Sequence, residues 1–492
     1  MSRNLIPEQT RLDPPVLEAL IQAHQHDKAP RLRRLWDYYR NPAIGTGPDG
    51  RPKLAQQCGL PSRLTQSEEG DWAGREPGRE IVIENDIAWR INTIVSFTFG
   101  KPPAIQSTAK DPARAKKIQS FLRQVIQHNG GPRFYQDLGL LGTVYGYVDV
   151  LVRISDSSAT DVEGAKRIHL DTMEAPRVIP ILNPDDYRCL DAYVLHIRRR
   201  NLPVEQNRFF SKVRNRVLGG AGRGSGEVVE FTHVWTPRSF RSYVGSPGIL
   251  GGGRRLVDEC VNRLGRIPVV HIQNLSQPFF YEGLSEVEPL IPLQDELNTR
   301  LSDRANRVTF QSFKMYLGKG IERFTERPVG PGQMWATDNP DAEIIEFGGD
   351  GQSPSEDAHI FEIREALDKT STVSPLAAGL LRSKVGNLTS ENALRIVMLG
   401  LLATVDKKRL TYGAGIEQVC EMILHAADVH GIFPNLPEER GVRLDWPEPL
   451  PDTDSQLLRN ALMKIEVGVP RQQVLTELGY FDHDPTPETA QA

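Results

Sequence analysis

A long two-faced helix is the feature that most constrains the fold of this chain. Between Leu284 and Phe310, apolar residues recur at helical spacing along one stripe, and charged residues gather on the other side. At about 1.5 Å per residue, such a helix would be roughly 40 Å long. The apolar stripe consists of Val287, Leu290, Ile291, Leu297, Leu301, Ala305 and Val308. The charged side consists of Asp295, Glu296, Arg300, Asp303, Arg304 and Arg307. A helix of this length with so narrow an apolar stripe is typical of one that lines or spans some larger structure.

Two prolines affect where this helix begins. Ser285 and Glu288 have the spacing of a capping box, which would start the helix near Leu284. Pro289 and Pro292 lie inside the helix so drawn, and an interior proline removes a backbone hydrogen bond. We therefore expect the regular helix to begin nearer Leu293, or to carry a kink there.

Length and composition bound the class of protein. A chain of 492 residues predicts about three domains, and the pattern of long helices with strand-rich stretches predicts a mainly helical α+β fold. The formal net charge is −4, from 59 basic and 63 acidic residues, which argues against static binding of nucleic acid.

The spacing of the four cysteines does not match that of a metal site, which favours a reducing compartment. The most apolar run, 396–405, is about half of the ~20 residues that span a bilayer, so we expect no membrane insertion.

The chain carries no recognisable catalytic motif. Gly100-Lys101 and Gly318-Lys319 lack the residues of a phosphate-binding loop, and 283–287 lacks the final glycine of a nucleophile elbow. We expect no catalytic residues, no metal and no cofactor. Asp185 and Asp186 follow Asn183-Pro184, a pattern that fits either a hard-cation site or, more simply, a capped turn.

Three further segments carry functional hypotheses. Residues 198–223 are strongly basic, which fits a mobile surface insertion or, alternatively, a patch that contacts phosphates. Residues 355–372 are predicted to form a second helix with an apolar face, followed by a loop over 376–390. Residues 391–430 are predicted to form the longest helix, and its first half is apolar all round, which predicts burial.

Four segments in fixed order resemble the portal proteins of tailed bacteriophages, especially the siphophage type. The first runs from Glu84-Asn85-Asp86-Ile87 to Phe99-Gly100-Lys101-Pro102-Pro103, and the second is Asp137 to Gly146, with its small-residue face. The third runs from Gly265-Arg266-Ile267-Pro268 through Asn274 to Gly283-Leu284-Ser285-Glu286. The fourth joins Ser374-Pro375 to Gly386-Asn387-Leu388-Thr389-Ser390-Glu391. Together they cover roughly residues 80–430.

The resemblance implies a portal fold with wing, stem, clip and crown, which assembles into a ring with a central channel. It divides the chain into an N-terminal helical arm (1–40), the wing (41–274), the first stem helix (275–310), the clip (311–349), the second stem helix (350–373), the tunnel loop (374–390), a long wing helix (391–430) and the crown (431–492). It implies a dodecameric ring at one capsid vertex, through which double-stranded DNA is packaged and ejected.

The resemblance also implies partners and contact residues. The partners would be the terminase large subunit, the major capsid and scaffolding proteins and a head–tail adaptor, with no membrane. The protein would be in the virion, and in the host cytoplasm during assembly. Candidate residues are Arg382, Ser383 and Lys384 in the tunnel loop; Glu296, Arg300, Asp303, Arg304 and Arg307 facing the channel; and Lys319, Arg323 and Arg327 in the clip, where motor or adaptor would dock.

Charge is consistent with a DNA channel, because a conduit must not hold the duplex that slides through it. Acidic and basic residues interleave on both predicted stem helices, and the loop contributes only Arg382 and Lys384. We predict that these two side chains touch phosphates weakly; the alternative is an ordinary exposed loop in which both are solvated.

Two rival hypotheses remain. One is a nucleic-acid-processing enzyme whose acidic site assembles from distant residues such as Asp185, Asp186 and Asp191. The other is a head–tail adaptor, which would also form rings but is usually a much shorter chain. The mass of the purified protein and metal-dependent nuclease activity would separate an enzyme from a portal.

Overall fold

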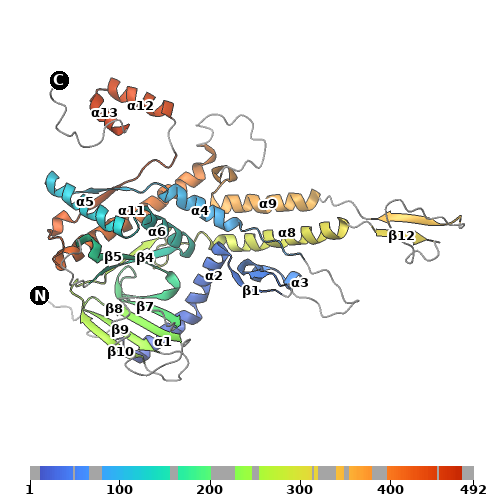
Figure 1. Cartoon of the computed structure of the whole chain (residues 1–492), viewed down its shortest axis with the longest axis horizontal. Helices are drawn as coiled ribbons and strands as arrows, with labels where there is room; N and C mark the ends of the chain where they lie inside the picture. The colour runs from blue at the N-terminus through green and yellow to red at the C-terminus, as the bar shows by residue number, and fades with distance from the viewer. Residues whose placement is uncertain are drawn as a thin grey trace. The chain divides into compact units, whose positions relative to one another are not determined.

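The computed structural model describes residues 12–47, 50–65, 80–155, 164–200, 228–245, 254–312, 315–319, 340–347, 354–378, 396–450 and 454–478. The chain divides into two compact units, Met1–Asp445 and Trp446–Ala492. The first unit combines helices and antiparallel sheets, and the described part of the second holds two helices (Figure 1). This composition confirms the mainly helical α+β prediction. No helix among the described residues is long and apolar enough to cross a membrane.

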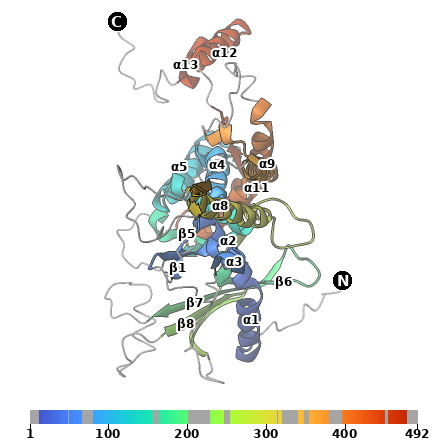
Figure 2. The same cartoon turned by 90° about the vertical axis from the view of Figure 1, so that its right-hand side faces the viewer.

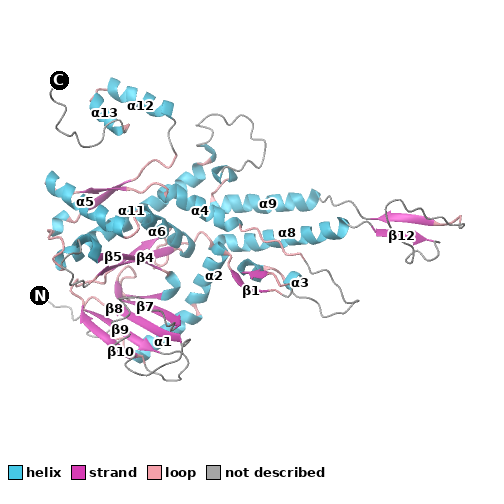
Figure 3. Cartoon of the chain, in the orientation of Figure 1, coloured by secondary structure: helices cyan, strands magenta, loops and turns pink. Residues whose placement is uncertain are grey.

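Two antiparallel sheets form the strand-rich part of the first unit (Figure 3). The larger sheet has the order β10-β9-β8-β7-β6, and the smaller has the order β11-β4-β5. The strands of the larger sheet are β6 (Val178–Leu182), β7 (Leu190–Arg200), β8 (Val228–Trp235), β9 (Ser239–Gly245) and β10 (Arg255–Val261). Those of the smaller sheet are β4 (Tyr147–Ile154), β5 (Ile168–Met173) and β11 (Val269–Gln273). Three two-stranded sheets complete the described strands: β1 (Ala43–Thr46) with β2 (Pro52–Leu54), β3 (Ala104–Ser107) with β14 (Val442–Asp445), and β12 (Met315–Lys319) with β13 (Glu343–Phe347).

Helix α1 (Pro14–His26) covers one face of the larger sheet. Its Leu17 and Ile21 are fully buried and pack against Ile179, Val194 and Val234. Helix α2 (Lys28–Arg40) continues into a different core, where it meets α4 and α6. The N-terminal helices are therefore fixed to the rest of the first unit by apolar burial.

Helices α4 (Asp86–Phe99), α6 (Pro132–Tyr145) and α11 (Leu399–Val429) pack closely because glycines lie at their contacts. A Cβ on Gly139 would meet the ring of Phe99, and one on Gly142 would meet the hydroxyl of Tyr412. Gly146 ends α6 with φ of +88°, a backbone conformation that favours glycine. The further helices of this unit are α3 (Ser62–Thr65), α5 (Pro112–His128) and α9 (Pro354–Ser371).

The long predicted helix is α8, and it begins at Ile291 and ends at Ser312. The predicted start at Leu284 is wrong, because a 3-10 turn, Glu288–Leu290, precedes the helix. Pro292 lies in the first helical turn, where its missing N–H would have no helical partner in any case. The observed start is thus close to the Leu293 that the prolines indicated.

The apolar first half of the longest predicted helix is not buried, which corrects that prediction. Ile396, Val397 and Leu399 are 72%, 40% and 66% exposed, whereas Leu401 and Val405 are buried against Ile94 and Val373. The described chain covers one side of this segment and leaves its other side exposed. The second unit holds α12 (Asp454–Glu466) and α13 (Arg471–Glu477), joined by a turn at Gly468.

Candidate functional site

The candidate site is the antiparallel pair of helices α8 and α9, which lie side by side in both views (Figures 1 and 2). A short apolar seam joins them. Leu297 and Leu301 of α8 are buried in one core with Ile360, Ile363 and Leu367 of α9. The seam opens towards the far end of α8, where Val308 is 40% exposed. Its inner half confirms the apolar stripes predicted for the two helices.

The five charged residues predicted to face a channel all form ion pairs within the chain. Glu296 and Asp303 both bind Arg300, with Arg300 Nε 2.7 Å from Glu296 Oε1 and Nη1 3.4 Å from Asp303 Oδ2. Asp303 also pairs with Arg63, which lies on α3. Arg304 reaches across to Asp357 of α9 at 2.8 Å, and Arg307 pairs with Glu356. These side chains are about a quarter to two-fifths exposed. Because water screens such ion pairs, they stabilise the folded chain only weakly.

A third face of α8 was missed at the sequence level. Polar residues recur at every fourth position, and their side chains bind the backbone of residues 80–84 and of the first turn of α4. Asn298 Oδ1 accepts from the Glu84 N–H at 3.0 Å, and Ser302 Oγ accepts from the Val82 N–H at 3.0 Å. The residues of this face are Gln294, Asn298, Ser302 and Asn306. We call these four residues the α8 polar row. The α8 polar row gives the backbone groups of residues 80–87 hydrogen-bond partners, which in a sheet a neighbouring strand would provide.

A buried arginine fixes the inner end of α9. Arg90 of α4 is fully buried, and its guanidinium donates to Asp86 Oδ2 at 2.8 Å and to Asp368 Oδ1 at 2.6 Å. It also donates to Ser371 Oγ at 2.9 Å and to the carbonyl of Val373 at 3.0 Å. Arg90 therefore fixes the point where α9 ends and the segment 374–390 begins.

A buried lysine joins α11 to the start of α8. Lys408 Nζ lies 2.5 Å from Glu286 Oε2 and donates to Thr143 Oγ1 and Asn274 Oδ1, each at 2.7 Å. Burial lowers the pKa of Lys408, and the adjacent carboxylate of Glu286 opposes that shift. Three acceptors match the three donors of an ammonium group, so the buried charge is fully satisfied.

Two comparisons with known proteins bear on this geometry. A family model described as "Phage portal protein, SPP1 Gp6-like" matches residues 18–491. The chain belongs to this portal protein family. This confirms the resemblance seen in the four sequence segments. No curated protein sequence matches the chain.

Solved structures from gene transfer agent particles are similar to the chain at low identity. A chain in "Virion of native gene transfer agent (GTA) particle" is 11% identical, with a TM-score of 0.42, over 80% of this chain and 88% of that one. A chain in "Neck of empty GTA particle computed with C6 symmetry" is 12% identical, with a TM-score of 0.43, over 80% and 90%.

The other predicted contact residues of this portal chain are only partly covered by the described structure. Arg382, Ser383 and Lys384 of the loop lie outside the described residues, as do Arg323 and Arg327 of the clip. Lys319 is described: it is exposed and ends β12 (Met315–Lys319), opposite Glu343 of β13 (Glu343–Phe347). The roles of all these residues stay predictions.

Asp185, Asp186 and Asp191, the acidic residues of the rival enzyme hypothesis, form the hydrogen bonds of a turn. The Asn183 side-chain oxygen accepts from the backbone N–H of Asp185 at 2.9 Å and of Asp186 at 3.2 Å. Asp186 pairs with Arg188 at 3.0 Å, and Asn183 donates to Asp191 at 3.1 Å. Hydrogen bonds from Arg188 lower the pKa of the Asp186 carboxyl. The simpler interpretation, a capped turn, accounts for these contacts.

Proposed function

We propose that this portal chain assembles as a ring of twelve copies at one vertex of a phage capsid, and that double-stranded DNA enters and leaves through the ring. The observation that carries the proposal is the charge-paired helix hairpin of α8 and α9. Each copy would contribute one such hairpin to the wall of the channel.

The charge of the hairpin suits a conduit. Helix α8 carries three acidic and three basic side chains, and α9 carries five acidic and two basic ones, so the pair has a formal charge of −3 with histidine neutral. A protein that neutralises several phosphates binds DNA tightly and releases counterions. Arginines that are already paired with carboxylates bind DNA phosphates weakly. A channel wall built from them would therefore let the duplex slide past.

The proposal assigns roles along the chain. Residues 41–274 and the helix in 391–430 would form the wing, 275–310 and 350–373 the stem, 311–349 the clip and 431–492 the crown, with 1–40 as an N-terminal arm. The clip, with Lys319, Arg323 and Arg327, would dock the terminase large subunit and later the head–tail adaptor. The outer parts would meet the major capsid and scaffolding proteins, first in the host cytoplasm and then in the virion.

The segment 374–390 would be the loop that approaches DNA, through Arg382 and Lys384. A double substitution, Arg382→Ala with Lys384→Ala, tests this assignment in a packaging reaction. We expect ring assembly to be unchanged and the packaging rate to fall severalfold, because each ring loses a set of weak phosphate contacts.

The matched control is Lys116→Ala with Lys117→Ala, two exposed residues of α5 with the same charge change. It should leave packaging at the wild-type rate. The loop assignment fails if the loop variant also packages DNA at the wild-type rate while its rings form normally.

A further inference from the structure

The loop between β11 and the start of α8 carries two exposed phenylalanines at its tip. Phe279 is 81% exposed and Phe280 is 57% exposed. The Phe279 ring makes one ring contact in the described structure, with Tyr187, at 6.4 Å between centroids. Phe279 also has φ of +71°, a left-handed backbone conformation that is unfavourable for a bulky side chain. We call residues 275–283 the aromatic loop.

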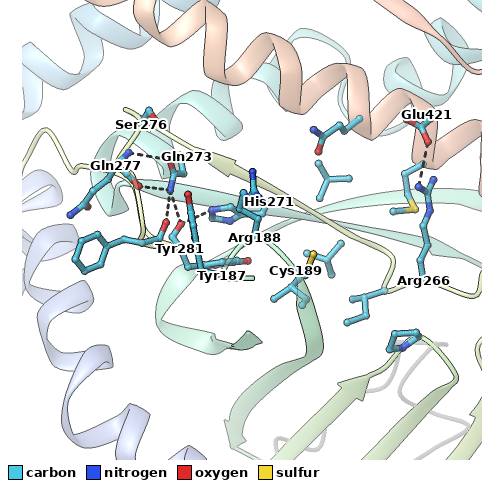
Figure 4. Close-up of a pocket in the computed structure, with 18 of the residues that line it drawn as sticks. Tyr187, Arg188, Cys189, Arg266, His271, Gln273, Ser276, Gln277, Tyr281 and Glu421 are labelled. Carbon is cyan, nitrogen blue, oxygen red and sulfur yellow. Dashed lines mark hydrogen bonds and ion pairs between the residues drawn. The ribbon is translucent and has the colours of Figure 1, made fainter. Parts of the chain in front are cut away.

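Hydrogen bonds fix the aromatic loop on both sides of its tip. Gln273 Oε1 accepts from the Gln277 N–H at 3.1 Å, and Gln273 Nε2 donates to the Phe280 carbonyl at 2.8 Å. The Tyr281 carbonyl lies 3.2 Å from Gln273 Nε2 and 2.7 Å from His271 Nε2. Figure 4 shows Gln273, Gln277 and Tyr281 together, at one end of a cavity that the loop borders. The two phenyl rings are thus presented at a defined place, which lowers the entropy lost when a partner covers them.

The strain at Phe279 gains the single chain almost nothing. A glycine would adopt φ of +71° without strain, whereas phenylalanine there costs free energy. Burial of the ring would offset that cost, but the ring is mostly in water. Strained residues of this kind gather at functional sites, and aromatic side chains are enriched at interfaces between proteins. The observed conformation therefore indicates a partner that covers the ring.

A second exposed apolar patch lies on the first turns of α11. Leu399 and Leu410 are 66% and 76% exposed, and Ile396, just before the helix, is 72% exposed. Leu399, exposed Ala403 and Leu410 are separated by four and seven residues, which places them on one side of the helix. We call Ile396, Leu399, Ala403 and Leu410 the α11 stripe. Contiguous apolar surface of this kind marks a site of contact with another protein.

The surroundings of the two patches match in charge. Asp406 and Lys407 lie on either side of the α11 stripe, are exposed, and form no ion pair within the described structure. The turn around Tyr187, beside the aromatic loop, carries exposed Asp185 and exposed Arg188. Asp185 likewise has no ion-pair partner among the described residues, and Arg188 pairs with a carboxylate of its own turn. Each patch thus presents one acid and one base to a partner, an arrangement that fixes orientation.

We propose that the aromatic loop of one copy packs on the α11 stripe of an adjacent copy. The two patches do not cover each other within one chain, because both stay mostly exposed. Two different patches of one subunit form a head-to-tail contact, which closes into a ring when the rotation between copies allows it. The proposal rests on the ring assembly proposed above, since the ring supplies the adjacent copy. Lys407 of one copy would then approach Asp185 of the next.

Photo-crosslinking within mixed rings tests this contact directly. A benzoylphenylalanine in place of Phe279 keeps an aromatic ring at the tip of the loop. Rings would be assembled from equal amounts of unlabelled and ¹⁵N-labelled chains, irradiated and digested. We expect crosslinked peptides that join position 279 to residues 396–410, with mixed-isotope pairs as frequent as same-isotope pairs, because neighbours in the ring are drawn at random.

The control crosslinker replaces Val261, which is 77% exposed on β10, and should not label residues 396–410. Same-isotope pairs alone would mean that the loop meets the stripe of its own chain, and would overturn the proposal. Crosslinks from position 279 to another segment, or to another protein of the particle, would overturn it as well.

The variant Phe279→Gly gives an independent measure, because it should move two properties in opposite directions. Glycine removes the backbone strain, so the dissociated chain should unfold at the same or a higher denaturant concentration than the wild type. Loss of the ring should lower the fraction of chains in rings at least about tenfold at a fixed concentration, as expected for an aromatic anchor. The control Leu436→Ala removes another apolar side chain, 57% exposed, and should assemble normally.

The outcomes separate this inference from the proposed function. A wild-type chain that forms no ring would contradict the proposed function. If the wild-type chain forms rings and Phe279→Gly forms them equally well, only the contact between the aromatic loop and the α11 stripe is wrong. A Phe279→Gly chain that loses stability as a single chain would show that the ring supports its own subunit, which also contradicts the inference.

Discussion

Arg90 shows how one side chain can fix the end of a helix, here α9. The segment 87–99 reads as an apolar helix in the sequence, and its single arginine gives no sign of its partners. Those partners, Asp368, Ser371 and Val373, lie about 280 positions further along the chain. Long-range pairing of this kind is invisible to local patterns, which is why neither Arg90 nor Lys408 was among the predicted site residues.

Replacing Arg90 by methionine should lower the free energy of unfolding by about 3–5 kcal/mol, because the carboxylates of Asp86 and Asp368 would lose the guanidinium that balances their charge. Chemical denaturation of the purified chain measures this change. Arg133→Met is the matched control: its side chain is 81% exposed and pairs with Asp137 on the helix surface, so the cost should stay within about 0.5 kcal/mol. A cost below about 1 kcal/mol for Arg90→Met would contradict the role given to Arg90.

Two buried histidines in the larger sheet make the fold sensitive to acid. Burial lowers the pKa of His196 to about 4, with Arg254 adding to the shift and Glu230 opposing it, and burial lowers the pKa of His233 to about 4 as well. An unfolded histidine has a pKa near 6.5, so between these values the unfolded chain binds more protons than the folded one. The stability is therefore fully present above about pH 6.5 and is lost as the pH falls towards 4.

The loss should be about 1–3 kcal/mol for each histidine. Denaturation midpoints measured from pH 7.5 to pH 5 test the sign and the size. His233→Phe, which keeps an aromatic ring beside Trp235 and Phe240, should reduce the pH dependence by about half. A variant with the wild-type pH dependence would show that His233 is not held neutral.

At the scale of the element, α8 has three faces where the sequence pattern predicted two. The apolar stripe and the charged side follow from hydrophobic period and were predictable. The α8 polar row was not, because amides and hydroxyls at every fourth position look like ordinary exposed helix residues. The backbone over 80–87 that they bind, which includes the first turn of α4, lies more than 200 positions away. The start of α8 was partly predictable, since Pro292 is compatible only with the first turn.

Asn298 is a fully buried residue of this row. Its side chain accepts from the Glu84 N–H and from Gln294 Nε2, and it donates to Gln56 Oε1. Asn298→Leu keeps the volume but leaves these buried groups unpaired, so it should cost about 2–4 kcal/mol in the free energy of unfolding.

Chemical denaturation measures the change in the free energy of unfolding. Hydrogen exchange locates the effect, since the Glu84 amide should lose its protection. Arg304→Leu, a substitution on the half-exposed side of the same helix, is the control and should cost less than about 1 kcal/mol. An equal loss of stability in the two variants would mean that the hydrogen bonds of the polar row do not stabilise the fold more than an exposed ion pair does.

At the scale of the whole molecule, the described part of the chain leaves apolar surface that its own core does not cover. The segment 396–402 was predicted to be buried, because apolar residues surround it on all sides. The prediction holds for Leu401 and fails for Ile396, Val397 and Leu399. The periodicity of the sequence predicts that a helix surface is apolar. It does not predict whether the same chain or another one buries that surface. Neighbouring copies in a ring would supply that cover.

The family was predictable from sequence, and the sheet order was not. Four short segments in order were enough to indicate a portal protein, and the family match confirms that assignment. The pairing of Arg304 with Asp357 and of Arg307 with Glu356 adds a physical reason for the hypothesis of a non-binding channel wall. The open edge of β11 became visible only when the sheet order was known.

The mass of the assembled protein tests the central claim most directly. Each chain has a mass of 55.1 kDa, so a ring of twelve would have a mass of about 660 kDa, twelve times that value. Native mass spectrometry of the purified chain, combined with electron microscopy of the same sample, should show closed rings of this mass with a central opening. A protein that remained a monomer or dimer, or that formed open-ended filaments, would contradict the account.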